Sequence, residues 1–126
     1  MSPASVFLNA PIKASTMIGT NVANLEGDSL GVIKEIVIEP HTFRVAYVVV
    51  SFGGFFRMRG KLFAMPFGLF RYDANKVEYI LDLAKEKLVE APGFDPEHWP
   101  SMADEKWHRD VFEYYGYRPW WEDSLL

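Results

Sequence analysis

A run of apolar, mostly β-branched residues near the middle of the chain restricts the possible folds more than any other feature. The segment "RVAYVVVSFGG", residues 44–54, is apolar at almost every position up to Phe52. Successive side chains of a strand point to opposite faces, so a strand built from this segment is apolar on both faces. Such a strand is typical of a sheet that is covered on both sides.

Shorter strand patterns surround this run. In "LGVIKEIVIEP" the second half alternates, with Ile36 and Ile38 on one face, and Pro40 ends the pattern because proline cannot donate to a ladder. Gly27 in "LEGDS" and Asp73 and Asn75 in "RYDANK" are turn formers. Further strands are predicted in "MIGTNVAN", "KLFAMPF" and "KVEYILDL". Five or six short strands between residues 16 and 82 predict a mainly β fold, a small antiparallel barrel or sandwich.

The pattern changes after Asp82. "LAKEKLVEA" contains good helix formers and is stopped by Pro92. "SMADEKWHRDVFEYYG" is the clearest predicted helix, with Ser101 and Asp104 as a start of the capping-box type and Gly116 just after its end. Its apolar positions form one stripe, made of Trp107, Val111, Tyr114 and Tyr115.

Residues 92–121 are unusually rich in aromatic side chains. A barrel of about 70 residues has a thin core and open edges, and each buried ring removes roughly 150–250 Å² from water. We therefore interpret this tail as a clamp that caps the barrel or reaches a second subunit. The clamp residues are Phe94, Trp99, Trp107, Phe112, Tyr115 and Trp120. The rival interpretation is a pocket for an aromatic ligand such as a quinone or flavin, but no glycine-rich cofactor loop or convergent polar set supports it.

Composition narrows the functional classes. The net charge of −4 argues against bulk nucleic-acid binding. The chain has no cysteine, which excludes disulfides and thiolate metal sites. The N-terminal residues lack a signal-peptide pattern, and the longest strongly apolar run, "VAYVVVSF", is far shorter than the ~20 residues of a membrane span. We expect a cytoplasmic protein.

The loop "GGFFRMRGK", residues 53–61, is the most informative candidate site. Its glycines and its cations Arg57, Arg59 and Lys61 could contact a phosphate or a nucleic acid, although the spacing fits no known phosphate-binding loop. Its apolar residues are expected to contact a second subunit or the protein's own tail. The complete set of predicted partner or dimer contacts is Phe55, Phe56, Met58, Trp99, Trp107, Tyr115, Trp120 and Trp121.

Metal binding and catalysis find little support. Asp104 and His108 lie at i and i+4 on the predicted helix, but a metal site needs a third ligand. "DPEHW" contains another acid–histidine pair, around His98, which is expected to cap a loop. No serine lies in a nucleophile elbow, and no carboxylate pair emerges from the spacing. We predict no cofactor, no metal and no enzymatic activity.

The order of these segments resembles the PRC-barrel domain family. The resemblance rests on "IGTNVANLEGDSLGVIKEIVIEPHTFRVAYVVVSFGG", "KLFAMPF" and "RYDANKVEYILDL", and the tail from "APGFDPEHWP" onwards resembles the extension of stand-alone bacterial members. It implies a small six-stranded antiparallel PRC-type β-barrel, similar to the cytoplasmic domain of the photosynthetic reaction centre H subunit, with an aromatic-rich C-terminal helical extension. The expected divisions are a flexible arm at 1–15, the barrel at 16–90 and the extension at 91–126.

The resemblance implies an adaptor rather than a reaction. We expect a non-enzymatic interaction module that forms a homodimer and docks to a protein partner. One alternative is an RNA- or ribosome-associated assembly factor that uses the basic loop 57–61. A second alternative, from family analogy, is an accessory protein of photosynthetic or respiratory electron transport.

Overall fold

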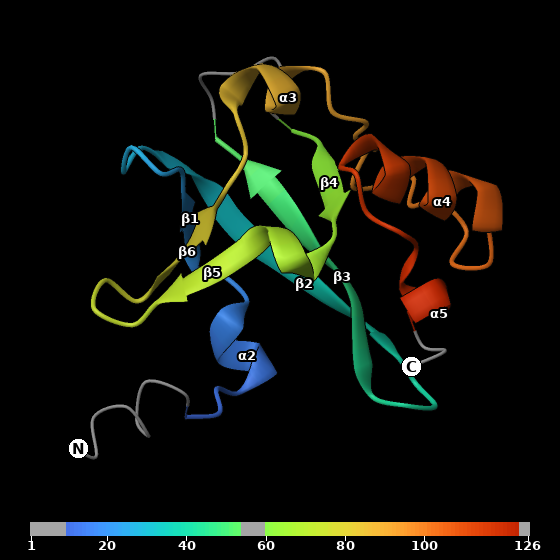
Figure 1. The fold of residues 1–126 in the computed structure, drawn as a ribbon, viewed down its shortest axis with the longest axis horizontal. Helices are drawn as coiled ribbons and strands as arrows, with labels where there is room; N and C mark the ends of the chain where they lie inside the picture. Colours follow the sequence, from blue (N-terminus) through green and yellow to red (C-terminus); the bar gives the residue numbers. More distant parts are fainter. Residues whose placement is uncertain (1–9, 54–59, 124–126) are drawn as a thin grey trace.

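The fold is a single curved sheet of six strands with short helices around it. The computed structural model describes residues 10–53 and 60–123 (Figure 1). The strands are β1 (Asn21–Ala23), β2 (Ser29–Glu39), β3 (Arg44–Phe52), β4 (Leu62–Met65), β5 (Phe70–Asp73) and β6 (Glu78–Leu81). The helices are α2 (Ala14–Met17), the 3-10 helix η1 (Phe67–Leu69), α3 (Lys85–Val89), α4 (Glu105–Tyr114) and α5 (Trp120–Asp123).

The sheet is mixed, and it forms a half-barrel. The strand order is β4-β3-β2-β1-β6-β5, so β4 and β5 are the two ends of the sheet. Four neighbouring pairs are antiparallel, but β1 and β6 are parallel, with Val22 opposite Tyr79. The prediction of an all-antiparallel barrel is therefore wrong in this respect. Alternation within a strand reports which face is buried, whereas the direction of a neighbour depends on where the β5–β6 hairpin returns to the sheet.

Strand β3 is covered on both faces, as its sequence predicts. Tyr47 and Val49 on one face and Val48 and Val50 on the other are all buried. Strand β2 deviates from its predicted alternation. Register shifts occur between Ile33 and Glu35 and between Val37 and Ile38, and after the second shift Ile38 is exposed.

The turns follow the residues that predicted them. Gly27 has φ +90°, β2 ends at Glu39 immediately before Pro40, and the Asp73 carboxylate accepts hydrogen bonds from the backbone N–H groups of Asn75 and Lys76. The N-terminal part differs from expectation. Residues 14–17 form α2, and the first strand begins only at Asn21.

The chain ends in a helical extension beside the sheet. Figure 1 shows α4 and α5 next to β4 and β3, on the side of the molecule away from β5 and β6. No helix within residues 10–53 and 60–123 has the length and apolar character needed to cross a lipid bilayer.

The close approach of β2 and β3 makes Gly31 a testable position. A Cβ atom at residue 31 would overlap the backbone carbonyl oxygen of Ser51 and lie 2.8 Å from Cα of Phe52. Gly31→Ala should therefore lower the free energy of unfolding by about 1–3 kcal/mol, because two paired backbones must separate. Urea denaturation followed by circular dichroism measures this loss.

Gly53→Ala is the matched control. Among the described residues its Cβ would meet the Leu30 carbonyl oxygen alone, at an ordinary 3.6 Å, so the change should stay within about 0.5 kcal/mol. Equal effects of the two substitutions would contradict the proposed backbone contact at Gly31.

Candidate functional site

The C-terminal extension begins by covering the free edge of β4. Leu62 and Phe94 form an antiparallel bridge with two backbone hydrogen bonds, each 2.9 Å long. The preceding residue, Gly93, lies so close to the Phe63 ring that a Cβ there would sit 2.7 Å from a ring carbon. An edge strand presents unpaired N–H and C=O groups, and this segment satisfies part of that edge.

Helix α4 is fixed at both ends by local hydrogen bonds. The N-cap is Asp104, whose carboxylate accepts from the backbone N–H of Trp107 at 3.0 Å. The prediction that Ser101 starts the helix is wrong by one turn, because its hydroxyl accepts from Ala103 N–H in the preceding turn. Gly116 ends the helix with φ +78°, and the N–H groups of Gly116 and Tyr117 donate to Glu113 and Phe112, which is a Schellman motif.

The buried face of α4 is rotated slightly from the predicted stripe. His108, Val111 and Phe112 are its buried residues, while Trp107 and Tyr114 are half-buried. Sequence reasoning missed His108 because histidine counts as polar in a hydrophobic pattern. Its i, i+3, i+4 spacing with Val111 and Phe112 is the signal that could have identified it.

The aromatic residues of the extension pack on the sheet of the same chain. Phe94 contacts Trp99 and Trp107 with ring centroids 4.9 and 5.8 Å apart. Trp120 packs 5.7 Å from both Tyr47 and Phe112. Edge-on and tilted arrangements at these distances add to the burial energy.

The other residues predicted to contact a partner or an anion differ in their burial. Tyr115 is buried within the chain, and its hydroxyl has no hydrogen-bond partner among the described residues. Trp121 is half-buried, with the Arg109 guanidinium 5.6 Å from its ring centroid. Lys61 is exposed. The remaining predicted loop residues lie outside the described residues, namely Phe55, Phe56, Arg57, Met58 and Arg59.

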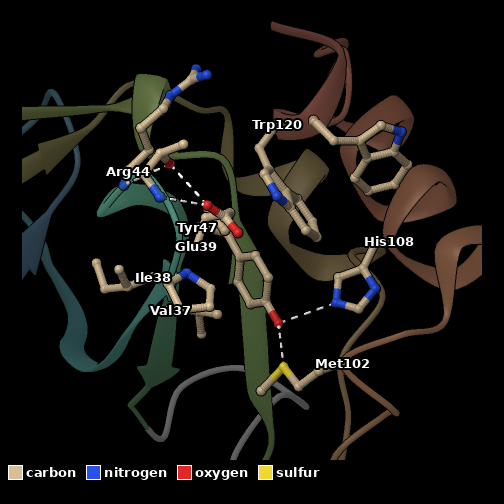
Figure 2. Close-up of a pocket in the computed structure, with 12 residues that line it drawn as sticks. Val37, Ile38, Glu39, Arg44, Tyr47, Met102, His108 and Trp120 are labelled. Atoms are coloured by element: carbon tan, nitrogen blue, oxygen red, sulfur yellow. Dashed lines mark hydrogen bonds between the residues drawn. The ribbon is translucent and has the colours of Figure 1, made fainter. Parts of the chain in front are cut away.

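A buried Tyr47–His108 pair joins the sheet to α4. His108 Nδ1 lies 2.7 Å from the backbone oxygen of Asp104, and since a carbonyl oxygen only accepts, Nδ1 carries the hydrogen. In the neutral ring Nε2 is then an acceptor for the Tyr47 hydroxyl, 3.2 Å away. The sulfur of Met102, 3.4 Å from the same hydroxyl, is the weaker acceptor. Figure 2 shows the Tyr47 hydroxyl between these two groups.

Asp104 and His108, whose i, i+4 spacing could suit a metal but is not predicted to form a site, bind different partners. The Asp104 carboxylate caps the helix, and His108 turns inward to Tyr47. The described part of the chain contains no group of three or more histidine, aspartate or glutamate side chains that could hold a metal ion. His98 lies in the loop before α4, 3.9 Å from Asp95, and both side chains are exposed.

Next to the Tyr47–His108 pair is an open cavity of about 660 Å³. One wall is the end of the β2–β3 hairpin, and the other is the C-terminal extension (Figure 2). Most of the lining is apolar or aromatic, and it includes Val37, Ile38, Ala46, Met102, Trp120 and Trp121. Glu39 and Arg44 add one charge of each sign to the wall formed by the hairpin. The volume lies within the roughly 300–1,000 Å³ typical of binding pockets.

The Tyr47 hydroxyl and the Glu39 carboxylate, two polar groups beside the cavity, already have hydrogen-bond partners. The Tyr47 hydroxyl is bound as described above, and the Glu39 carboxylate accepts from the backbone N–H groups of His41 and Thr42 and from the Thr42 hydroxyl. The hydrogen bond from Thr42 N–H holds the pKa of Glu39 below its ordinary value. The site therefore offers an apolar, aromatic surface more than free acid–base groups.

The Tyr47–His108 hydrogen bond generates a stability prediction. Tyr47→Phe leaves His108 Nε2 buried without a donor and should lower the free energy of unfolding by about 1–3 kcal/mol. The double variant Tyr47→Phe/His108→Phe should lose less than the sum of the single losses, because neither polar partner is then left unsatisfied. Urea denaturation measures the losses of Tyr47→Phe, of His108→Phe and of the double variant. Tyr72→Phe, at an exposed position on β5, is the control. Strict additivity would contradict the hydrogen bond.

A pH dependence follows from the same tyrosine. Burial raises the pKa of Tyr47 to about 12, against about 10 in an unfolded chain. Stability is therefore complete below pH ~10 and falls as the pH rises towards 12, by up to ~1.4 kcal/mol per pH unit for each such tyrosine. The raised pKa of buried Tyr115 acts in the same direction. Tyr47→Phe should reduce this slope in alkaline urea titrations, and an unchanged slope would contradict the burial of the hydroxyl.

Comparison with known proteins agrees with this architecture. A protein of Deinococcus radiodurans described as uncharacterised is 31% identical over 89 residues, which cover 69% of this chain and 31% of that protein. The chain thus spans about a third of the length of that relative. The family model of the PRC-barrel domain matches residues 11–88, a range that contains all six strands and leaves α4 and α5 outside. The chain therefore belongs to the PRC-barrel domain family.

Proposed function

We propose that this chain is a non-enzymatic docking module that forms a homodimer and contacts protein through one end of the molecule. This end, the hairpin end, consists of the β2–β3 hairpin, the cavity beside it and helix α5. The single observation that carries the proposal is the open apolar cavity there, lined by side chains from both the half-barrel and the extension.

Exposed apolar side chains at the hairpin end support protein contact. Phe43 at the hairpin turn, Ile38 on β2 and Met102 before α4 are all exposed, and the last two also line the cavity. Exposed apolar surface beside a concave site is typical of an interaction surface, and aromatic residues and methionine are enriched in such surfaces.

The chemistry of the hairpin end favours binding over catalysis. A catalytic site needs a nucleophile or general base near an open position for the reacting atom. Here the Tyr47 hydroxyl is engaged by His108 and Met102, and one oxygen of the Glu39 carboxylate accepts three hydrogen bonds from its own turn. We expect these groups to shape the surface without taking part in a reaction.

The two alternative functions stay predictions. For the RNA- or ribosome-associated alternative, Lys61 is exposed, but Arg57 and Arg59 lie outside the described residues. The alternative of an accessory in electron transport has no specific observation of the described residues behind it.

Size-exclusion chromatography with light scattering tests the proposal. We expect a species of twice the 14.5 kDa chain mass at micromolar concentration. The reason is that contact with a second copy of the chain buries the exposed apolar groups of the docking surface. A clean 14.5 kDa species over the same concentrations would contradict homodimer formation.

A further inference from the structure

Phe43, at the turn of the β2–β3 hairpin, has an unfavourable backbone conformation and an unfavourable degree of exposure within its own chain. Its φ of +62° lies in the left-handed region, which costs an L-residue with a Cβ roughly 1–2 kcal/mol. Its side chain is also 83% exposed, so the ring gains little from burial. Asparagine or glycine would suit the backbone conformation better.

The turn that carries Phe43 is held by several hydrogen bonds. The Phe43 N–H donates to the Glu39 backbone oxygen at 2.9 Å, and one oxygen of the Glu39 carboxylate accepts from His41 N–H, Thr42 N–H and the Thr42 hydroxyl. The Thr42 hydroxyl accepts in turn from Arg44 N–H at 3.3 Å. The ring is therefore presented on a preorganised turn, which lowers the entropy cost of docking it.

The apolar cavity lies beside the same hairpin, but Phe43 is not part of its lining. Thr42 and Arg44, on either side of Phe43 in the sequence, do line it, together with Ile38 and Ala46. Hence one hairpin carries both an exposed ring and one wall of a cavity of about 660 Å³ that the ring does not enter in its own chain.

Two copies of the chain related by a two-fold axis can bury the exposed Phe43 ring and fill the cavity at the same time. In an interface with two-fold symmetry the same patch serves on both subunits, so a ring from one copy enters the cavity of the other and the reverse contact is made as well. We propose that the occupant of the cavity is Phe43 of a second copy of this chain, exchanged reciprocally between two hairpin turns. This inference rests on the proposed homodimer and assigns its interface.

The charges of the hairpin are complementary under the same symmetry. Glu39 and Arg44 are directly opposite in the β2–β3 register and both line the cavity. The Arg44 guanidinium has no hydrogen bond or ion pair within the described residues, and Figure 2 shows it directed away from the cavity. A second hairpin related by a two-fold axis presents the same pair in the reverse order, which allows Arg44 of each copy to face Glu39 of the other.

The test compares two substitutions at two turns. Phe43→Asn removes the ring but suits a positive φ, so the fold should be kept. At a concentration where both proteins are monomeric, its unfolding midpoint should be no lower than that of the wild type. Val77→Asn is the matched control, because Val77 also has a positive φ, +53°, is 60% exposed and is the last residue of the turn between β5 and β6. Figure 1 shows this turn away from the hairpin end.

Sedimentation equilibrium gives the dimer dissociation constant of each protein. We expect Phe43→Asn to raise it at least about thirty-fold, as for a central aromatic residue of an interface, and Val77→Asn to leave it unchanged. A wild-type dimer that Phe43→Asn leaves intact would overturn this inference and keep the homodimer. A wild-type monomer would overturn both, and it would leave the cavity to another protein.

Cross-linking locates the contact directly, because the chain contains no cysteine of its own. A tagged His41→Cys variant, which places a thiol on the same exposed turn and keeps the Phe43 ring, is mixed with an untagged Ile38→Cys variant and treated with a short bifunctional thiol reagent. A mixed adduct is expected, and Val77→Cys in place of His41→Cys should give none. Absence of the mixed adduct, or equal yield with Val77→Cys, would overturn the proposal.

Discussion

The packing of aromatic residues of the C-terminal extension on the Tyr47 face of β3 is the interaction on which the rest of the structure depends. Val48 and Val50 are buried on one face of β3, whereas Tyr47, on the other face, contacts rings of the C-terminal extension. A ring buries roughly 150–250 Å², which corresponds to several kcal/mol at about 25 cal/mol per Å². Without Phe112 and Trp120 from the same chain, Tyr47 and its neighbours on this face would be exposed to solvent.

The same arrangement creates the candidate site. The strands belong to the part of the chain that matches the PRC-barrel domain, whereas α4 and α5 follow it. Rings of the extension contact Tyr47 on β3, and the cavity beside this contact is lined by Ile38 from the hairpin and Trp121 from the extension. The docking surface is thus a product of how the extension and the half-barrel meet.

Much of the fold follows from local patterns. The covered strand β3, the stop at Pro40, the turn at Asp73 and the end of α4 at Gly116 are each set by neighbouring residues, and the structure confirms them. The parallel β1–β6 pair could not be predicted in this way, because alternation does not encode the order of strands. The buried Tyr47–His108 pair could not be predicted for a related reason. His108 becomes a core residue only because Tyr47, 61 positions earlier, supplies a hydrogen bond.

The positions of the tryptophans permit a direct test of the central interaction. All four tryptophans, at positions 99, 107, 120 and 121, lie in the extension, whereas far-ultraviolet circular dichroism reports mainly the sheet and helices of the whole chain. Urea unfolding followed by both signals in one sample shows whether the extension and the half-barrel form one cooperative unit. If the extension seals β3, the two transitions coincide in midpoint and slope. A tryptophan transition complete at a urea concentration where the circular dichroism is still native would contradict the account.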